Sequence, residues 1–125
     1  MNETSPLVVC EPERLGSRWA TVTIDKMTDD QVSLHVSILA GGDEKIYGRD
    51  IQVSLLAGPH AEPLNVIAFP EADFLLPEAG LRSRTALADY VFANPRRYRL
   101  LEAVVTLGTD TGVFNLRNFV LPPQH

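Results

Sequence analysis

The sequence predicts an all-β fold: a single domain over residues 1–125, built as an antiparallel β-sandwich of seven to eight strands. Apolar and polar residues alternate with period two in residues 19–25, 31–39 and 51–55. Strands of this kind have one face against a core and the other in water, as is typical of antiparallel sheets. The length of 125 residues and the hydrophobic fraction of 45% fit one domain with one buried core.

Shorter apolar segments complete the expected set of strands. Residues 6–10 and 64–69 are brief apolar runs bounded by polar residues or proline. Residues 98–108 and 112–121 form the clearest hairpin, which we expect to turn at Thr109-Asp110-Thr111. Many short strands separated by turn residues are typical of a sandwich.

One segment, residues 82–95, allows two interpretations. A helix starting at Ser83 as N-cap is compatible with its alanine and leucine content. A strand is favoured, because it places four apolar residues on one face. Those residues are Ala86, Ala88, Tyr90 and Phe92.

The same region carries a resemblance to a known family. In "YVFANPRRYRLLEAVVTLGTDTG" a Pro turn follows one strand and a Tyr opens the next. This pattern is similar to the end of an immunoglobulin-like domain of the PKD type, over roughly residues 88–112. The matching positions are Phe92, Pro95, Tyr98 and Leu100. The resemblance implies an immunoglobulin-like sandwich, and such domains are mostly adhesion or spacer modules on secreted proteins.

Two details of this segment depart from the family pattern. Arg96 stands where the family has Gly. The alternation slips at Leu100-Leu101, which predicts a β-bulge there.

The charge of the chain is unevenly distributed. The net charge is −5, which disfavours nucleic acid as a partner. Residues 1–78 hold 13 acidic and 5 basic residues, whereas residues 79–125 hold 3 acidic and 6 basic ones. We expect either a solvated surface or an arginine patch that meets an acidic protein or a second copy of the chain. The basic residues are Arg82, Arg84, Arg96, Arg97, Arg99 and Arg117.

The sequence also indicates where the protein works. No apolar run reaches the length of a membrane span, so no membrane partner is expected. The N-terminal segment lacks the pattern of a signal peptide. Cys10 is the only cysteine and cannot form an internal disulfide. A cytoplasmic location is therefore expected.

Catalytic motifs are not recognisable. The three histidines, His35, His60 and His125, are scattered and lack the context of a nucleophile. One cysteine and three scattered histidines are a poor set of ligands for a zinc site, so neither a metal nor a cofactor is expected. The run Gly41-Gly42-Asp43-Glu44 resembles a cyclase motif, but Lys45 follows it and strands precede it, so a loop is expected.

Two groups of residues remain as candidates for ligand binding. Trp19 lies on the expected wet strand face, where it offers apolar contact area for a sugar or a protein. The other residues expected on this face are mostly small and polar, and they are Thr21, Thr23, Ser33, His35, Ser37, Gln52 and Ser54. If alternate loops gather at one end of the sandwich, several acidic side chains meet there, and calcium is a conceivable ligand. They are Glu11, Glu13, Asp43, Glu44, Glu71, Asp73 and Asp110. The opposite end would carry Asp29, Asp30, His60, Glu62 and residues 95–97.

The sequence therefore predicts a non-catalytic binding or assembly module. Its expected partner is another protein or a second copy, bound through the arginine-rich stretch 82–99 or a strand edge. One alternative is a sandwich that binds carbohydrate or calcium, and another is a small hydrolase whose site carries no recognisable motif. The sequence leaves the partner, the oligomeric state and the order of the strands open.

Overall fold

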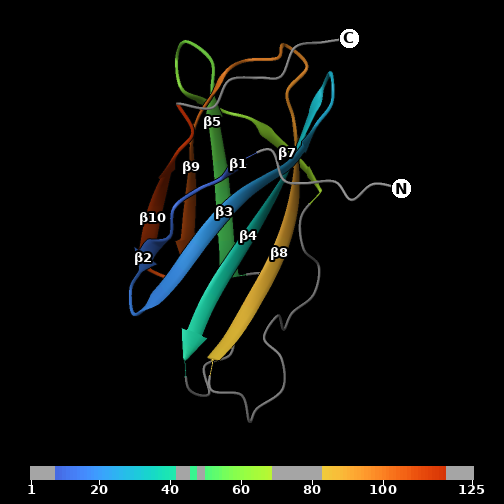
Figure 1. Ribbon diagram of the computed structural model, residues 1–125. Coiled ribbons are helices and arrows are strands. Elements are labelled where there is room, and N and C mark those ends of the chain that lie inside the picture. Colours follow the sequence, from blue (N-terminus) through green and yellow to red (C-terminus); the bar gives the residue numbers. More distant parts are fainter. Residues whose placement is uncertain (1–7, 42–45, 48–49, 69–82, 118–125) are drawn as a thin grey trace, which may run out of the picture.

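The computed structural model describes residues 8–41, 46–47, 50–68 and 83–117, and these residues form ten strands in two antiparallel sheets. Figure 1 shows the strands running along the long axis of the domain. They are β1 (Val8–Val9), β2 (Glu13–Leu15), β3 (Arg18–Met27), β4 (Gln31–Gly41), β5 (Ile51–Ala57), β6 (Glu62–Pro63), β7 (Asn65–Ala68), β8 (Ser83–Ala93), β9 (Leu100–Leu107) and β10 (Asp110–Asn115). The described residues include no helix long and apolar enough to cross a membrane.

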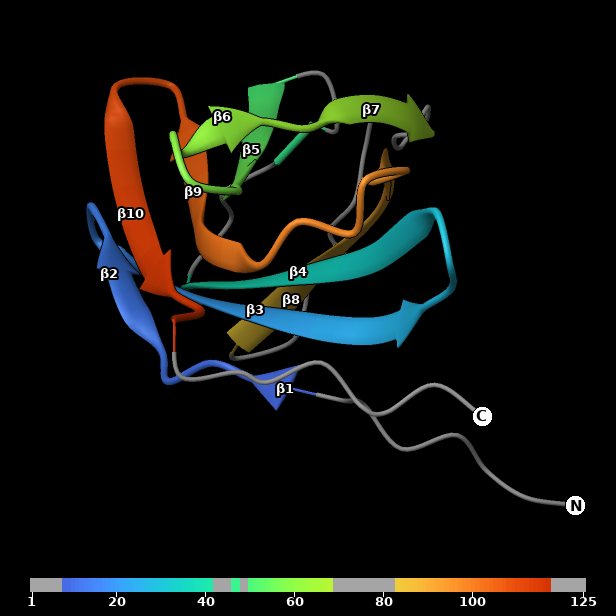
Figure 2. The same cartoon turned by 90° about the horizontal axis from the view of Figure 1, so that it is seen from above.

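The two sheets pack face to face, as the view in Figure 2 shows. Sheet A has six strands in the order β1-β3-β4-β8-β7, with β2 also paired to β3. Sheet B has four strands in the order β10-β9-β5-β6. The predicted all-β class and the two-layer antiparallel arrangement are thus confirmed.

The long strands form because their sequence alternation matches the pleat. In β3, Ala20, Val22 and Ile24 are fully or nearly fully buried, while the residues between them are partly exposed. The pairing of β4 with β8 runs without interruption from Gln31↔Ala93 to Gly41↔Ser83. This regular register fixes which outward side chains become neighbours, because a shift of one residue would turn every apolar side chain outward.

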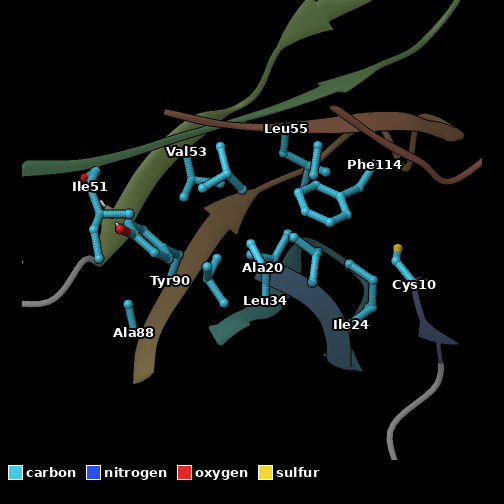
Figure 3. Packing of buried hydrophobic residues seen from close by; sticks show 14 of the residues in the cluster. Cys10, Ala20, Ile24, Leu34, Ile51, Val53, Leu55, Ala88, Tyr90 and Phe114 are labelled. Carbon is cyan, nitrogen blue, oxygen red and sulfur yellow. Dashed lines mark hydrogen bonds between the residues drawn. The ribbon is translucent and has the colours of Figure 1, made fainter. Parts of the chain in front are cut away.

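The core lies between the sheets and is filled by side chains from both. Figure 3 shows Ile51, Val53 and Leu55 of β5 facing Leu34 and Tyr90 of sheet A. The largest fully buried side chains include Phe92 and Phe114. Burying an aromatic or aliphatic side chain stabilises the fold by roughly 1.5–3 kcal/mol each, so this cluster is the main source of stability.

The chain changes sheets twice between β4 and β8. Strand β4 of sheet A ends at Gly41, and the next strand, β5, begins at Ile51 in sheet B. It returns at Leu64, which separates β6 in sheet B from β7 in sheet A and donates its backbone N–H to Leu55. The sequence shows the strands but not these crossings.

Most predicted strands are confirmed. Residues 83–93 are a strand, as favoured from the sequence, and β9 carries the predicted bulge, since Leu56 pairs with Glu102 but Ala57 with Leu100. Two details differ from the prediction. The last hairpin turns at Gly108-Thr109, one residue earlier than predicted, because Asp110 already pairs with Leu107. The short strands β2 and β6 were not predicted, since two or three residues carry no visible alternation.

The expected wet face needs a further correction. Gln52 and Ser54 alternate like the polar residues of β3 and β4, and the sequence places them on one surface with Trp19. They belong to β5, however, and β5 lies in sheet B. Because the outer faces of the two sheets point in opposite directions, Gln52 and Ser54 are on the far side of the sandwich from Trp19.

Candidate binding surface on the outer face of sheet A

The outer face of sheet A is organised in rows that cross β3, β4 and β8. Trp19 pairs with Leu39, and Thr21 pairs with Ser37, which pairs in turn with Leu87. The next row is Thr23, His35 and Asp89. Successive rows are about 7 Å apart, two residues along each strand. The face therefore has an apolar end at Trp19 and a charged part beginning at His35.

The apolar end consists of side chains that water can reach. Trp19 is 45% exposed, Leu39 43% and Leu87 52%. Trp19 and Leu39 line a shallow hollow of about 450 Å³ together with Pro12, Thr21 and Ser37. We call Pro12, Trp19, Leu39 and Leu87 the Trp19 patch. Exposed apolar side chains are unremarkable singly, but a group of them on one face marks a contact surface.

Trp19 is held in position by its neighbours. The guanidinium of Arg14, which lies opposite Trp19 on β2, is 5.2 Å from the centre of the indole ring. A cation over an aromatic face contributes roughly 0.5–1 kcal/mol at an exposed site. The ring is thereby ordered before any partner arrives, so binding loses less side-chain entropy.

The charged part of the face contains three residues from three strands. They are Asp25 of β3, His35 of β4 and Asp89 of β8, and one ligand atom of each lies within 4.8 Å of the others. His35 Nδ1 is 2.6 Å from Asp89 Oδ1. We call these three residues the Asp–His cluster.

Three loops meet at the end of the domain where β3 turns into β4. The backbone N–H of Asn94 donates to the Asp30 carbonyl at 2.7 Å. The Tyr98 ring lies against Gly58, where an added Cβ would be 3.0 Å from ring atoms. Gly58 belongs to the turn that leads to His60 and Glu62, so the predicted grouping of residues 29–30, 60–62 and 95–97 is correct. Next to them, a hollow of about 300 Å³ is lined by residues 62–65, 93–96 and Tyr98.

The arginine-rich stretch does not form one patch, contrary to the expectation from sequence. Arg84 pairs with Ala40 near the start of β8, whereas Arg96 and Arg97 follow the end of that strand. At about 3.3 Å per residue, some 30 Å separate the backbone of Arg84 from Ala93, where β8 ends just before Arg96. A run of like residues along a strand this long cannot present its charges to one partner site.

The described arginines after β8 are engaged within the chain. Arg96 donates to the Tyr98 hydroxyl at 3.1 Å, and this hydrogen bond raises the pKa of the guanidinium, which is charged in any case. Arg97 is 3.8 Å from Asp29. Arg99 donates to the Arg117 carbonyl, and Arg117 lies 3.9 Å from Glu102. These contacts tie loops together rather than leaving a free cationic surface.

Asp110 is likewise part of the scaffold. Its carboxylate is 3.1 Å from the Arg18 guanidinium and lies directly over Gly16, where an added Cβ would be 2.3 Å from Oδ2. The contact joins the β2–β3 turn of sheet A to the β9–β10 turn of sheet B. A carboxylate already neutralised by arginine is a poor ligand for calcium, so Asp110 does not support the calcium alternative.

Replacing Gly16 with Ala is expected to destabilise the domain by about 1–2 kcal/mol. Gly16 has a φ of +70°, which strains any residue with a Cβ, and the new methyl group displaces the Asp110 carboxylate. Urea unfolding measures the change. The penalty should be smaller in an Asp110→Ala background, and an equal penalty in both backgrounds would contradict the contact.

The remaining predicted site residues fall largely outside the part of the chain that the structure describes. Arg82, Asp43, Glu44 and Asp73 lie outside the described residues. Glu11 and Glu13 line a hollow of about 260 Å³ beside Cys10 and Phe114. The acidic end of the domain therefore has no assembled site among the described side chains.

Nucleophilic chemistry finds little support in the described residues. Burial raises the pKa of the Cys10 thiol, which keeps it protonated and unreactive. The His35–Asp89 pair resembles part of a hydrolase triad, but no hydroxyl of the described side chains is hydrogen-bonded to His35. Among the described residues, the hollow on this sheet face is shallow and open to water.

The Asp–His cluster was missed from sequence because its members are far apart in the chain. His35 and Asp89 are separated by 54 positions and meet only through the β4–β8 register. One signal was available for Asp25. After Ile24 the alternation slips, with polar Asp25 and Lys26 in succession before Met27, and such a slip predicts a bulge.

Comparison with known proteins identifies no relative: no family model, curated protein or solved structure matches this chain.

Proposed function

We propose that this protein is a non-catalytic, immunoglobulin-like binding module that docks another protein on the Trp19 patch. The observation that carries the proposal is the group of exposed apolar side chains around a hollow, at one end of an otherwise small and polar sheet face. A cytoplasmic location fits a chain whose single cysteine is buried and free.

The strand order supports the immunoglobulin-like assignment. Immunoglobulin domains of the constant type have strands A, B, E and D in one sheet and C, F and G in the other, and a C′ strand can follow C. We assign the letters A, B, C, C′, D, E, F and G to β3 to β10 as they follow along the chain. The sheet order of this protein is then A-B-E-D for β3-β4-β8-β7 and G-F-C-C′ for β10-β9-β5-β6. Tyr98, just before β9, occupies the corner where such domains place a tyrosine.

The composition of the Trp19 patch favours a protein as the partner. Trp is among the residues that contribute most to interface affinity, and leucines around it exclude water from the contact. The surrounding Thr21 and Ser37 supply hydroxyl groups at the margin of the hollow. This combination of an apolar centre and a polar rim is typical of protein interfaces.

A different protein fits this surface better than a second copy. Two copies stacked by their sheet A faces with their strands parallel would bring Asp25 and Asp89 of both chains over one another, close to the contact. Like charges placed together across an interface oppose association, and the net charge of −5 adds to the repulsion. The partner is therefore expected to present apolar side chains on a surface that is neutral or basic near the Asp–His cluster.

The test compares capture of proteins by the wild type and by Trp19→Ala. We expect a protein that binds the wild type to be lost with Trp19→Ala and retained with Val113→Ser, a control on β10 of sheet B with a similar exposure of 48%. Titration of the purified pair should then show a loss of about 30-fold or more in affinity, corresponding to roughly 2 kcal/mol.

The single tryptophan gives a direct second readout. Because Trp19 is the only tryptophan of the chain, its fluorescence reports the patch alone. Docking should shift the emission to shorter wavelength as the indole leaves water. A partner that binds the wild type and Trp19→Ala equally would contradict the proposal. A concentration-dependent dimer in light scattering would also contradict it, as would a fluorescence shift caused by an oligosaccharide instead of a protein.

A further inference from the structure

The Asp–His cluster brings two carboxylates and an imidazole to one point on the sheet A face. His35 and Asp89 are directly paired across β4 and β8, and Asp25 reaches them from β3 on the other side of His35. The three ligand atoms lie within 4.8 Å of one another. The Asp89 side chain is 79% exposed, so an ion in solution has access to the cluster.

Two aspartates in this position lack a permanent counter-charge. Among the described residues, neither Asp25 nor Asp89 is ion-paired with a lysine or arginine, and Asp89 is paired only with His35. Histidine neutralises a carboxylate only when it is protonated. The cluster is therefore a place where a bound cation would relieve the repulsion between two carboxylates.

A β-bulge adds Asp25 to this face. Ile24 pairs with Leu34 and Lys26 with Ser33, so Asp25 is the extra residue between them. In a regular register Lys26 would oppose Val32 and point toward the core. The bulge keeps Lys26 outward, lets Met27 pack against the core, and leaves Asp25 beside His35.

We propose that Asp25, His35 and Asp89 bind a divalent transition-metal ion such as Zn²⁺. Imidazole nitrogen and carboxylate oxygen are both zinc ligands, whereas calcium and magnesium prefer oxygen alone. Three protein ligands on an open face leave at least one coordination position for water. This site uses other residues than the proposed protein contact, which lies at the apolar end of the same face.

Only a small rearrangement is needed to form the site. Two ligands of a tetrahedral ion with bonds of about 2.1 Å are roughly 3.4 Å apart. His35 Nδ1 and Asp89 Oδ1, at 2.6 Å, must separate slightly, while the third ligand atom moves inward. Rotation of the exposed Asp89 side chain, which no other described residue holds, widens the first distance, and a small movement of the Asp25 side chain shortens the others. The hydrogen bond between His35 and Asp89 is thus exchanged for two bonds to the ion, and the proton that the two atoms share moves to His35 Nε2 or to water.

Calorimetric titration of the full chain with zinc chloride tests the proposal. We expect one zinc ion to bind the wild type, and His35→Gln, Asp25→Asn and Asp89→Asn each to weaken binding by at least about tenfold. Cobalt provides a spectroscopic check, since a nitrogen and oxygen site gives visible absorption bands that His35→Gln should abolish. In nuclear magnetic resonance spectra, the His35 ring signals should move on addition of zinc.

His60→Gln is the matched control. His60 is exposed in the turn after β5 and belongs to no cluster of ligands among the described residues, so this variant should bind zinc as the wild type does. Melting temperatures without metal verify that each variant is folded. Zinc affinity that persists in His35→Gln, or that disappears in His60→Gln, would overturn the assignment, and so would wild-type protein that binds no zinc.

Discussion

Replacing Asn94 with Ala is expected to destabilise the domain by about 2–4 kcal/mol, the largest effect of any polar substitution that the described residues suggest. Asn94 is 3% exposed and is the buried polar residue of the described core. Its Oδ1 accepts from the Tyr98 N–H and its Nδ2 donates to the Tyr98 carbonyl, both at 3.0 Å. Alanine would leave both backbone groups without partners.

The position of Asn94 explains why the expected loss of stability is large. Its side chain closes the connection from β8 to β9, in which Arg97 adopts a φ of +54°, an unfavourable value for a residue with a Cβ. Its backbone also holds the β3–β4 turn through the Asp30 carbonyl. Loss of the two side-chain hydrogen bonds therefore loosens the end of the domain where three loops meet.

Asn94→Asp and Asn65→Ala make this prediction specific. Aspartate retains the acceptor for the Tyr98 N–H but places negative charge beside the Tyr98 carbonyl, so its stability relative to the wild type should improve as the pH falls and the carboxyl can donate. Asn65 lines the same hollow but is exposed, and its replacement should change stability by less than about 0.5 kcal/mol. Urea unfolding measures all three variants, and equal effects of Asn94→Ala and Asn65→Ala would contradict the account.

The strands of this fold could be predicted because each carries its own signal. The alternation of apolar and polar residues in β3, β4 and β5 reflects burial of one face of each strand, and each of these strands has seven to eleven consecutive residues that carry it. The bulge at Leu101 was visible for the same reason, as a slip in local alternation. Local patterns therefore determine the strands and even their irregularities.

The division of strands between sheets has no such local signal. Gln52 and Ser54 look like the polar residues of β3, yet they lie on the opposite surface, because the chain crosses to sheet B before β5. The described arginines of residues 82–99 do not form one patch for a related reason: β8 carries Arg84 and Arg96 to opposite ends of the domain. Proximity in sequence is a poor guide to proximity in space once a strand of eleven residues intervenes.

The candidate sites show the same division. Trp19 could be predicted as an outward residue, but its association with Leu87 depends on the pairing of three strands, which places the Ser37–Leu87 pair in the row next to Trp19 and Leu39. The Asp–His cluster needs three strands and a bulge before its members meet. Sequence indicated the kinds of side chain that face water, and only strand pairing showed which of them can act together.

Tyr90 is expected to make the domain lose about 2–3 kcal/mol of stability as the pH rises from about 10 to 12. Tyr90 is 4% exposed and its hydroxyl donates to the Ile51 carbonyl at 3.3 Å. Burial raises the pKa of this phenol from 10.0 to about 12. The unfolded chain therefore releases the proton first, so unfolding becomes more favourable through this range, and the stability is fully retained below it.

Tyr90→Phe should reverse its rank against the wild type across this range. At neutral pH the variant lacks the hydrogen bond to Ile51 and should be less stable by about 0.5–1.5 kcal/mol. Above pH 11 it should be the more stable protein, because phenylalanine has no proton to lose. Urea unfolding at a series of pH values measures both curves, and their difference removes contributions from Cys10 and the lysines. Tyr98→Phe keeps Tyr90 and should therefore keep the alkaline decline, whereas parallel curves for Tyr90→Phe and the wild type would show that Tyr90 is not the group responsible.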